Sequence, residues 1–113
     1  MGLRKDLDSI KKRCIYTLSI DDKIIYIGTA CNPRSRYQSH LKRSKTESSL
    51  LYRFIRASKQ VPKMTIISEI FGTYEMAEKE EIRNIELNSD TCLNFYNNPN
   101  KNRYNELDKQ YAI

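Results

Sequence analysis

The sequence predicts an α+β domain with a small, mostly antiparallel three-stranded sheet flanked by helices. Its 113 residues fit one small domain, so we expect residues 1–113 to share a single core. Short segments with alternating or β-branched apolar residues occur at 14–20, 24–29 and 64–71, and these predict the strands. Segments with helical spacing of apolar residues separate and flank them, which predicts helices on both sides of the sheet.

The first two strands form a predicted hairpin that follows an N-terminal helix. Residues 3–13 have apolar side chains at helical spacing and three cations in the last turn, which suits the helix dipole. Residues 14–20 and 24–29 are joined only by the short polar link at 21–23, so they predict an antiparallel hairpin. Gly28, inside the second strand, indicates a bulge or a close approach to the backbone.

Two helices, a strand and a further helix are predicted next. Asn32 fits the N-cap of a helix over 33–45 that begins with proline. The apolar residues of 48–59 lie on one face and predict a second helix. Residues 64–71 are rich in β-branched side chains and predict the third strand, which a helix over 74–88 follows.

The C-terminal segment has weaker signals. Residues 92–95 are expected to form a short strand or an extended edge, and the Asn-rich run at 97–102 is expected to be a loop. Residues 103–113 have apolar side chains at helical spacing, so we expect a short helix there.

Composition excludes several classes of protein. No run approaches the roughly 18 apolar residues of a membrane helix, and the N-terminal segment lacks the apolar region of a signal peptide. We therefore expect no membrane partner and a cytoplasmic location. The three cysteines form no CxxC pair and there is one histidine, so we expect core thiols in a reducing compartment rather than a zinc cluster.

Positive charge is concentrated in the first half of the chain. Residues 1–63 hold 15 Lys and Arg against 5 Asp and Glu, a net charge of +10. Residues 64–113 hold 5 against 9, a net charge of −4. Such asymmetry indicates a surface for a polyanion, although cations that merely solubilise exposed faces would give the same count.

Glu81 lies near the middle of the apolar side of the helix predicted over 74–88, and Glu78 is nearly as close to that side. Burial of an unpaired carboxylate is unfavourable, so such a residue needs a partner. An arginine, a rim position open to solvent or a metal ion would each satisfy it, and the residues alone leave these three possibilities open.

Two tyrosines and two basic residues in the stretch from 14 to 40 have ordinary explanations when taken singly. Tyr16 and Tyr26 could both be core aromatics. A phenol, whose ordinary pKa is near 10, becomes a general base only where its surroundings perturb it. Arg36 and His40 are four residues apart on one helix face, and each could be a surface residue.

As an ordered set, these residues resemble the GIY-YIG nuclease superfamily, over about residues 14–97. Cys14-Ile15-Tyr16 stands where the family has GIY, and Tyr26-Ile27-Gly28 matches YIG. Arg36 takes the position of the family's arginine, and His40 that of its frequent histidine. The departure is Cys14, which replaces a glycine of backbone packing and so bears on the geometry of the hairpin rather than on the reacting groups.

Two later segments complete the resemblance. The segment at 77–85, AEKEEIRNI, fits the family's metal-binding helix and selects Glu81 over Glu80. The family's last motif is an asparagine after an apolar residue. Asn94 and Asn97 both qualify, and we favour Asn94 because it is closer to the helix.

The resemblance implies a metal-dependent endonuclease that hydrolyses DNA phosphodiester bonds by a one-metal mechanism. Glu81 would hold Mg²⁺ or Mn²⁺, with water and a phosphate oxygen as most of the other ligands, and the metal would stabilise the departing 3′ oxygen. With the metal in place, a modest lowering of the pKa of the tyrosine would be enough for it to act as the base. The resemblance implies that Arg36 contacts the scissile phosphate. It implies that Tyr16 accepts the proton of the attacking water and that Tyr26 positions that water or the phosphate. His40 would relay a proton or bind the phosphate, and Asn94 or Asn97 would orient neighbouring groups.

The helices predicted over 33–45 and 48–59 would provide the DNA surface. Such contacts are mostly independent of sequence and weaken with salt. The chain leaves no room for a separate DNA-reading domain, so we expect low sequence specificity, or specificity that comes from a homodimer or a separate partner. The expected DNA-binding residues are Arg34, Lys42, Arg43, Lys45, Arg53 and Arg56.

Two alternatives compete with the nuclease hypothesis. One is a non-cleaving nucleic-acid-binding or inhibitory module that retains the fold. The other is a structural protein whose tyrosines and Glu81 are only core groups. Every catalytic position of the family is filled here, which favours the nuclease.

Overall fold

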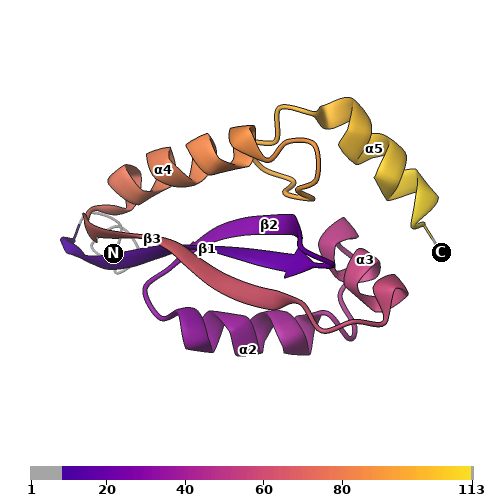
Figure 1. Cartoon of the computed structure of the whole chain (residues 1–113), viewed down its shortest axis with the longest axis horizontal. Helices are drawn as coiled ribbons and strands as arrows, with labels where there is room; N and C mark the ends of the chain where they lie inside the picture. Colours follow the sequence, from indigo (N-terminus) through magenta and orange to yellow (C-terminus); the bar gives the residue numbers. More distant parts are fainter. Residues whose placement is uncertain (1–8, 113) are drawn as a thin grey trace.

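The structure is a computed structural model, and it describes residues 9–112 (Figure 1). This part of the chain contains β1 (Lys11–Ile20), β2 (Lys23–Ala30), α2 (Pro33–Arg43), α3 (Leu50–Ser58), β3 (Lys63–Gly72), α4 (Tyr74–Leu87) and α5 (Lys101–Gln110). The strands form one antiparallel sheet in the order β2-β1-β3. The predicted α+β class and the three-stranded sheet with its flanking helices are therefore confirmed.

The N-terminal helix predicted over 3–13 is wrong at its C-terminal end. Residues 3–8 lie outside the described residues, whereas Lys11, Lys12 and Arg13 belong to β1 and pair with the end of β3. Arg13 is buried there, and its Nε donates to the carbonyl of Gly72 at 3.1 Å. The three cations therefore extend the first strand, because β3 lies beside them.

The β1–β2 hairpin closes through Asp21 and Asp22, whose φ angles are 54° and 64°. Positive φ at both central residues is the pattern of a type I′ turn, and the twist of this turn matches that of the strands. The register of the hairpin shifts between Leu18 and Ser19. The sequence predicts a bulge or a close approach at Gly28. Gly28 itself pairs with Tyr16, and the irregularity of this hairpin lies nearer its turn, at Leu18 and Ser19.

The helices begin at polar caps. The side chain of Asn32 accepts from the backbone N–H of Ser35 at 3.1 Å, as predicted for the start of α2. Thr73 caps α4 in the same way, and Asn100 caps α5, which begins two residues before its predicted start. None of the helices within residues 9–112 has the combined length and apolar composition that crossing a bilayer requires.

Helices cover both faces of the sheet. In Figure 1, α2 and α4 lie on opposite sides of it, and α3 and α5 lie near one end. Tyr16 and Leu18 pack with residues of α3 and α5 in one core cluster. Ile15 and Ile27 pack with α4 in a second cluster. The strict alternation along β1 therefore sends the motif tyrosine and the motif isoleucine to different cores.

Residues 92–94 run along the edge of β2 that faces away from β1. The backbone N–H of Leu93 donates to the carbonyl of Ile25 at 2.7 Å. Asn94 follows, and its amide binds both backbone groups of Ile27. No strand is assigned to residues 92–94, so the segment is the extended edge, one of the two predicted forms.

The prediction of core thiols holds for two of the three cysteines. Cys14 and Cys92 are buried, and neither is in a disulfide. Cys31 is exposed, because it lies in the turn between β2 and α2 rather than in an element with a core face.

Candidate active site

A cavity of about 330 Å³ lies where β2, α2, α4 and the loop after residue 94 meet. It brings together Tyr26, Arg36 and Glu81, which the sequence places on three separate elements. Of the two candidate asparagines, Asn97 lines it. The full lining is Tyr26, Gly28, Thr29, Arg36, Tyr74, Glu78, Glu81, Tyr96 and Asn97.

Tyr16 is fully buried and does not line this cavity. It pairs with Gly28 across the hairpin, and a Cβ atom on Gly28 would lie 2.5 Å from the Tyr16 hydroxyl oxygen. The phenol ring therefore lies directly over the glycine of the YIG motif. A close approach to the backbone at Gly28 is one of the two features that the sequence predicts there, and the group that approaches is the side chain of Tyr16.

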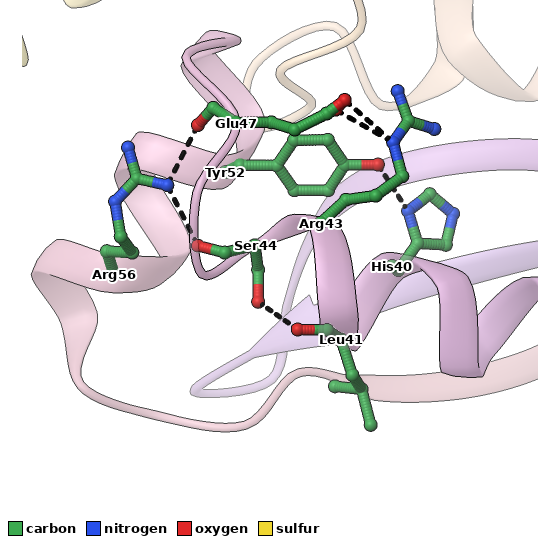
Figure 2. Close-up of polar contacts among 7 residues, drawn as sticks. All are labelled: His40, Leu41, Arg43, Ser44, Glu47, Tyr52 and Arg56. Carbon is green, nitrogen blue, oxygen red and sulfur yellow. Dashed lines mark hydrogen bonds and ion pairs between the residues drawn. The ribbon is translucent and has the colours of Figure 1, made fainter.

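A chain of hydrogen bonds connects Tyr16 to His40 and Tyr52. The Tyr16 hydroxyl lies 2.7 Å from His40 Nε2, and the Tyr52 hydroxyl lies 2.9 Å from Nδ1 (Figure 2 shows the latter bond). A neutral imidazole donates through one nitrogen and accepts through the other, so the two phenols take opposite roles. Tyr26 packs edge-on against the same imidazole, with ring centroids 5.3 Å apart. Tyr52 lies outside the apolar stripe of its helix, and nothing in the sequence indicated its contact with His40.

The imidazole of His40 is neutral at physiological pH. Burial lowers the pKa of His40 to about 4, and the positive charges of Arg36 and Arg43 act in the same direction. A neutral, buried ring cannot attract a phosphate by charge. Of the two roles expected for His40, the geometry therefore favours proton relay.

The tyrosines are poorer bases than the sequence led us to expect. Burial raises the pKa of Tyr16, and Tyr26 raises it further, whereas Arg36 lowers it. Burial and the charge of Glu81 likewise raise the pKa of Tyr26. In the protein without a bound cation, neither tyrosine pKa is lowered, because burial outweighs the arginine; the lowering expected beside a metal ion stays a prediction.

Thr29 connects the glutamate of α4 with the arginine of α2. Its hydroxyl donates to the carboxylate of Glu81, and its carbonyl accepts from Arg36 Nη1 at 3.4 Å. Burial raises the pKa of Glu81, the hydrogen bond from Thr29 lowers it, and the neighbouring Glu78 raises it. Within residues 9–112, Glu81 forms no ion pair with an arginine. Of the three possibilities that the sequence leaves open for this carboxylate, exposure to solvent at a rim and binding of a metal ion therefore remain.

The oxygen atoms around Glu81 fit one hard divalent cation. Glu81, Glu78 and Asn97 line the same cavity and carry carboxylate or amide oxygens, which Mg²⁺ and Mn²⁺ prefer. Among the described residues, no three His, Cys, Asp or Glu side chains gather into a metal site. Most ligands would therefore be water and substrate oxygens. A cation there would also lower the pKa of Glu81 and so oppose the increase that burial and the charge of Glu78 cause.

Four of the six predicted DNA-binding residues are exposed. Arg34, Lys42 and Lys45 are exposed on α2 and just after it. Arg43 is also exposed, but its Nε binds Glu47 at 3.0 Å, and its guanidinium lies 5.2 Å from the ring centroid of Tyr52.

The other two, Arg53 and Arg56, bind the protein itself. The side chain of Arg53 is only 12% exposed and pairs with Asp108 of α5. Arg56 Nη1 donates to the carbonyls of Ser44 and Glu47, at 2.9 and 2.8 Å (Figure 2). These carbonyls follow the C-terminus of α2, where backbone acceptors lack partners within the helix. Both guanidiniums are therefore engaged within the protein, and their contact with DNA stays a prediction.

Asn94 and Asn97 occupy different environments. Asn94 is buried; its Oδ1 accepts from the N–H of Ile27 at 3.2 Å, and its Nδ2 donates to the carbonyl at 2.8 Å. Asn97 lines the cavity, with a φ of 61° that asparagine tolerates. Asn94 thus anchors the segment that presents Asn97.

Comparison with known families gives one match. A sequence model of the GIY-YIG catalytic domain matches residues 12–105, which is most of the chain. Comparisons with curated proteins and with solved structures find no match. The matched range contains β2, β3, all of β1 after Lys11, and every residue that lines the cavity.

Proposed function

The chain belongs to the GIY-YIG family, and from this premise we propose that it is a metal-dependent endonuclease that hydrolyses phosphodiester bonds in DNA. Membership of the family supports a nuclease function in general. The observation that carries the finer proposal is the cavity in which Tyr26, Arg36 and Glu81 meet. A phenol, a fixed cation and a carboxylate are groups that activation of water and stabilisation of a phosphoryl transition state require.

Arg36 is the group proposed to bind the scissile phosphate. It is exposed on α2, lines the cavity, and is held at one end by the carbonyl of Thr29. A guanidinium offers several donors in a fixed plane, so it can follow the charge that grows on phosphate oxygens.

Glu81 is the residue proposed to hold the divalent cation, with Glu78 and Asn97 on the same wall. When bound, Mg²⁺ or Mn²⁺ supplies Lewis-acid stabilisation of the leaving 3′ oxygen. Thr29 fixes the orientation of the Glu81 carboxylate through its hydroxyl. Such a hydrogen bond to a ligating carboxylate keeps the remaining oxygen lone pairs directed into the cavity.

Two tyrosines are candidates for the base. Tyr26 lines the cavity and can meet a water molecule there, whereas Tyr16 is buried behind it and bonded to His40. We therefore assign the contact with the attacking water to Tyr26. Tyr16 and His40 pack behind it, with ring centroids 6.1 and 5.3 Å from that of Tyr26, and are hydrogen-bonded to each other.

A plasmid-nicking assay with Mg²⁺ or Mn²⁺ tests the proposal. We expect Glu81→Gln and Arg36→Ala to lower the nicking rate by about 100-fold or more, and EDTA to abolish it. Glu80→Gln and Arg83→Ala are matched controls, because these residues pair with each other at 2.6 Å outside the cavity. Intact plasmid with the wild-type protein in both metals would overturn the proposal, and so would equal rates in the site and control variants.

One observation favours the non-cleaving alternative. The pKa values of both Tyr16 and Tyr26 are raised, which opposes formation of a phenolate. A gel shift in EDTA separates the two functions. Retention of DNA by a protein that never nicks it would establish a binding module, whereas retention followed by nicking when Mg²⁺ is added supports the enzyme.

A further inference from the structure

Two adjacent aromatic side chains protrude beside the cavity. Tyr96 is 77% exposed and Phe95 is 57% exposed. Their rings meet edge to face at 90°, with centroids 5.0 Å apart. Exposed aromatic clusters of this kind mark binding surfaces, because a soluble protein gains nothing by leaving them in water.

The two rings are held in place by the core beneath them. Phe95 packs edge to face on Tyr104, which is buried, with centroids 5.6 Å apart. The segment that carries the two rings is closed by a hydrogen bond between the residues that flank it, in which the amide of Asn98 donates to the carbonyl of Asn94 at 2.9 Å. Asn94 is itself fixed to β2. The rings are therefore presented in a set orientation, which reduces the entropy that a ligand must overcome.

Tyr96 lies at the junction of two hollows. The first is the cavity of about 330 Å³ that holds Glu81. The second, of about 270 Å³, shares Tyr26, Arg36 and Tyr96 with the first and is also lined by Phe95. A phosphate bound by Arg36 would therefore lie in a hollow that Tyr96 also lines, and Phe95 lines the second hollow beside it.

Cationic charge accompanies the aromatic pair. Lys101 Nζ donates to the carbonyl of Phe95 and lies 4.8 Å from the centroid of its ring. Arg43 also lines the second hollow and is exposed. Aromatic faces beside cations are the combination that binds single-stranded nucleic acid, with the bases stacked on the rings and the backbone on the cations.

We propose that Tyr96, supported edge to face by Phe95, forms a stacking platform for one unpaired nucleobase next to the scissile phosphate. Within a duplex both faces of a base are covered by its neighbours, so only a single-stranded, flapped or mismatched nucleotide can offer a face to Tyr96. DNA with an unpaired nucleotide at the cut is therefore the preferred substrate. This inference rests on the proposed function for the identity of the polymer, and it adds which form of DNA is preferred.

The test is equilibrium binding of labelled oligonucleotides in EDTA, with a single strand and a perfect duplex of the same sequence as the two probes. We expect Tyr96→Ala to weaken binding of the single strand by roughly 5- to 140-fold, because stacking one base contributes about 1–3 kcal/mol. Tyr96→Phe keeps the ring and should bind like the wild type. The matched control is Phe71→Ala, because Phe71 is 75% exposed on β3 and lines neither hollow.

Selective loss of single-strand binding in Tyr96→Ala, with Tyr96→Phe and Phe71→Ala unchanged, supports the platform. Equal loss on both probes overturns it, and so does no loss on either or a wild type with no affinity for the single strand. A change of oligomeric state on sedimentation with unchanged DNA affinity also overturns it, because the rings would then form a protein interface. Nicking of plasmid is scored separately, so a platform without cleavage, or cleavage without a platform, is recognised as such.

Discussion

His40 is the only histidine of the chain, so the acid dependence of folding between about pH 5 and 7.5 reports chiefly on one buried side chain. It is 3% exposed and lies between the hydroxyls of Tyr16 and Tyr52. Burial, with Arg36 and Arg43 nearby, lowers its pKa from 6.5 to about 4. As the pH falls, the unfolded chain therefore binds a proton before the folded protein does. The stabilisation is complete above pH 6.5 and is lost as the pH falls toward 4.

The size of this effect follows from the two pKa values. The interval from 6.5 to about 4 corresponds to about 3 kcal/mol, at about 1.36 kcal/mol per unit. Between about pH 7.5 and pH 5, the proton linkage of this one group removes about 2 kcal/mol of unfolding free energy. Glu81 acts in the opposite direction, because its raised pKa stabilises the fold as the pH falls. The contribution of His40 must therefore be isolated with a variant.

The assay is urea unfolding, followed by circular dichroism, of the wild type and His40→Gln at the two pH values. Glutamine can both donate and accept a hydrogen bond but does not titrate. We expect the wild type to lose about 2 kcal/mol more than the variant on acidification, a difference of roughly 0.7–2 M in the urea midpoint. The proton resonances of the single imidazole measure the pKa directly in the folded protein.

Two results would refute this reasoning. One is an imidazole that titrates near 6.5 in the folded protein, because burial would then not be lowering its pKa. The other is an equal loss of stability in the wild type and in His40→Gln, because the acid dependence would then come from carboxyl groups. In either case the relay role favoured for His40 would lose its basis.

Three further predictions concern the surroundings of the site. Tyr52→Phe removes the partner of the imidazole Nδ1 and should lower the unfolding free energy by about 1–3 kcal/mol, measured by urea unfolding, and displace the pH–rate profile of nicking. Gly28→Ala should abolish nicking and destabilise the fold by about 1–3 kcal/mol, because the new Cβ would clash with a buried phenol ring; Gly72→Ala, whose Cβ would meet a flexible methionine, should be milder. Duplex affinity in EDTA should fall as salt rises, with a log–log slope that Arg34→Ala makes shallower by about one and that Arg83→Ala leaves unchanged.

Most elements could be predicted because their ends are determined locally. The cap at Asn32 and the turn at 21–23 are signals read from neighbouring residues; the cap is confirmed, and the turn is confirmed at Asp21 and Asp22, whereas Lys23 already belongs to β2. Lys11, Lys12 and Arg13 show the limit of local signals. Cations suit the last turn of a helix, but they also occur at the end of a strand, and pairing with β3, some 60 residues away, decides between the two forms.

The residues of the candidate site likewise fall into those that the sequence could predict and those that it could not. Tyr26, Arg36 and Glu81 could be proposed from motif spacing, and they line one cavity. Thr29 and Tyr52 could not, because each acts by contact with an element distant in sequence. The arginines of α3 show a related limit. Arg56 looked like a surface cation until the structure showed which backbone carbonyls it satisfies at the end of α2.

The raised pKa values of Tyr26 and Glu81 have a common origin. Both groups are partly buried in one cavity, and the charge of Glu81 is among the causes that raise the pKa of Tyr26. In the proposed reaction, the phenol must lose its proton while the carboxylate stays ionised, and Arg36 is the single arginine that lines their cavity among the described residues. Positive charge brought in beside Glu81 would therefore favour both ionisations together. Glu81→Gln separates the two effects, since it removes the negative charge that opposes Tyr26 and also removes the proposed ligand. Loss of nicking in that variant would mean that a more acidic tyrosine does not suffice without the cation, whereas retained nicking would overturn the metal-binding role proposed for Glu81.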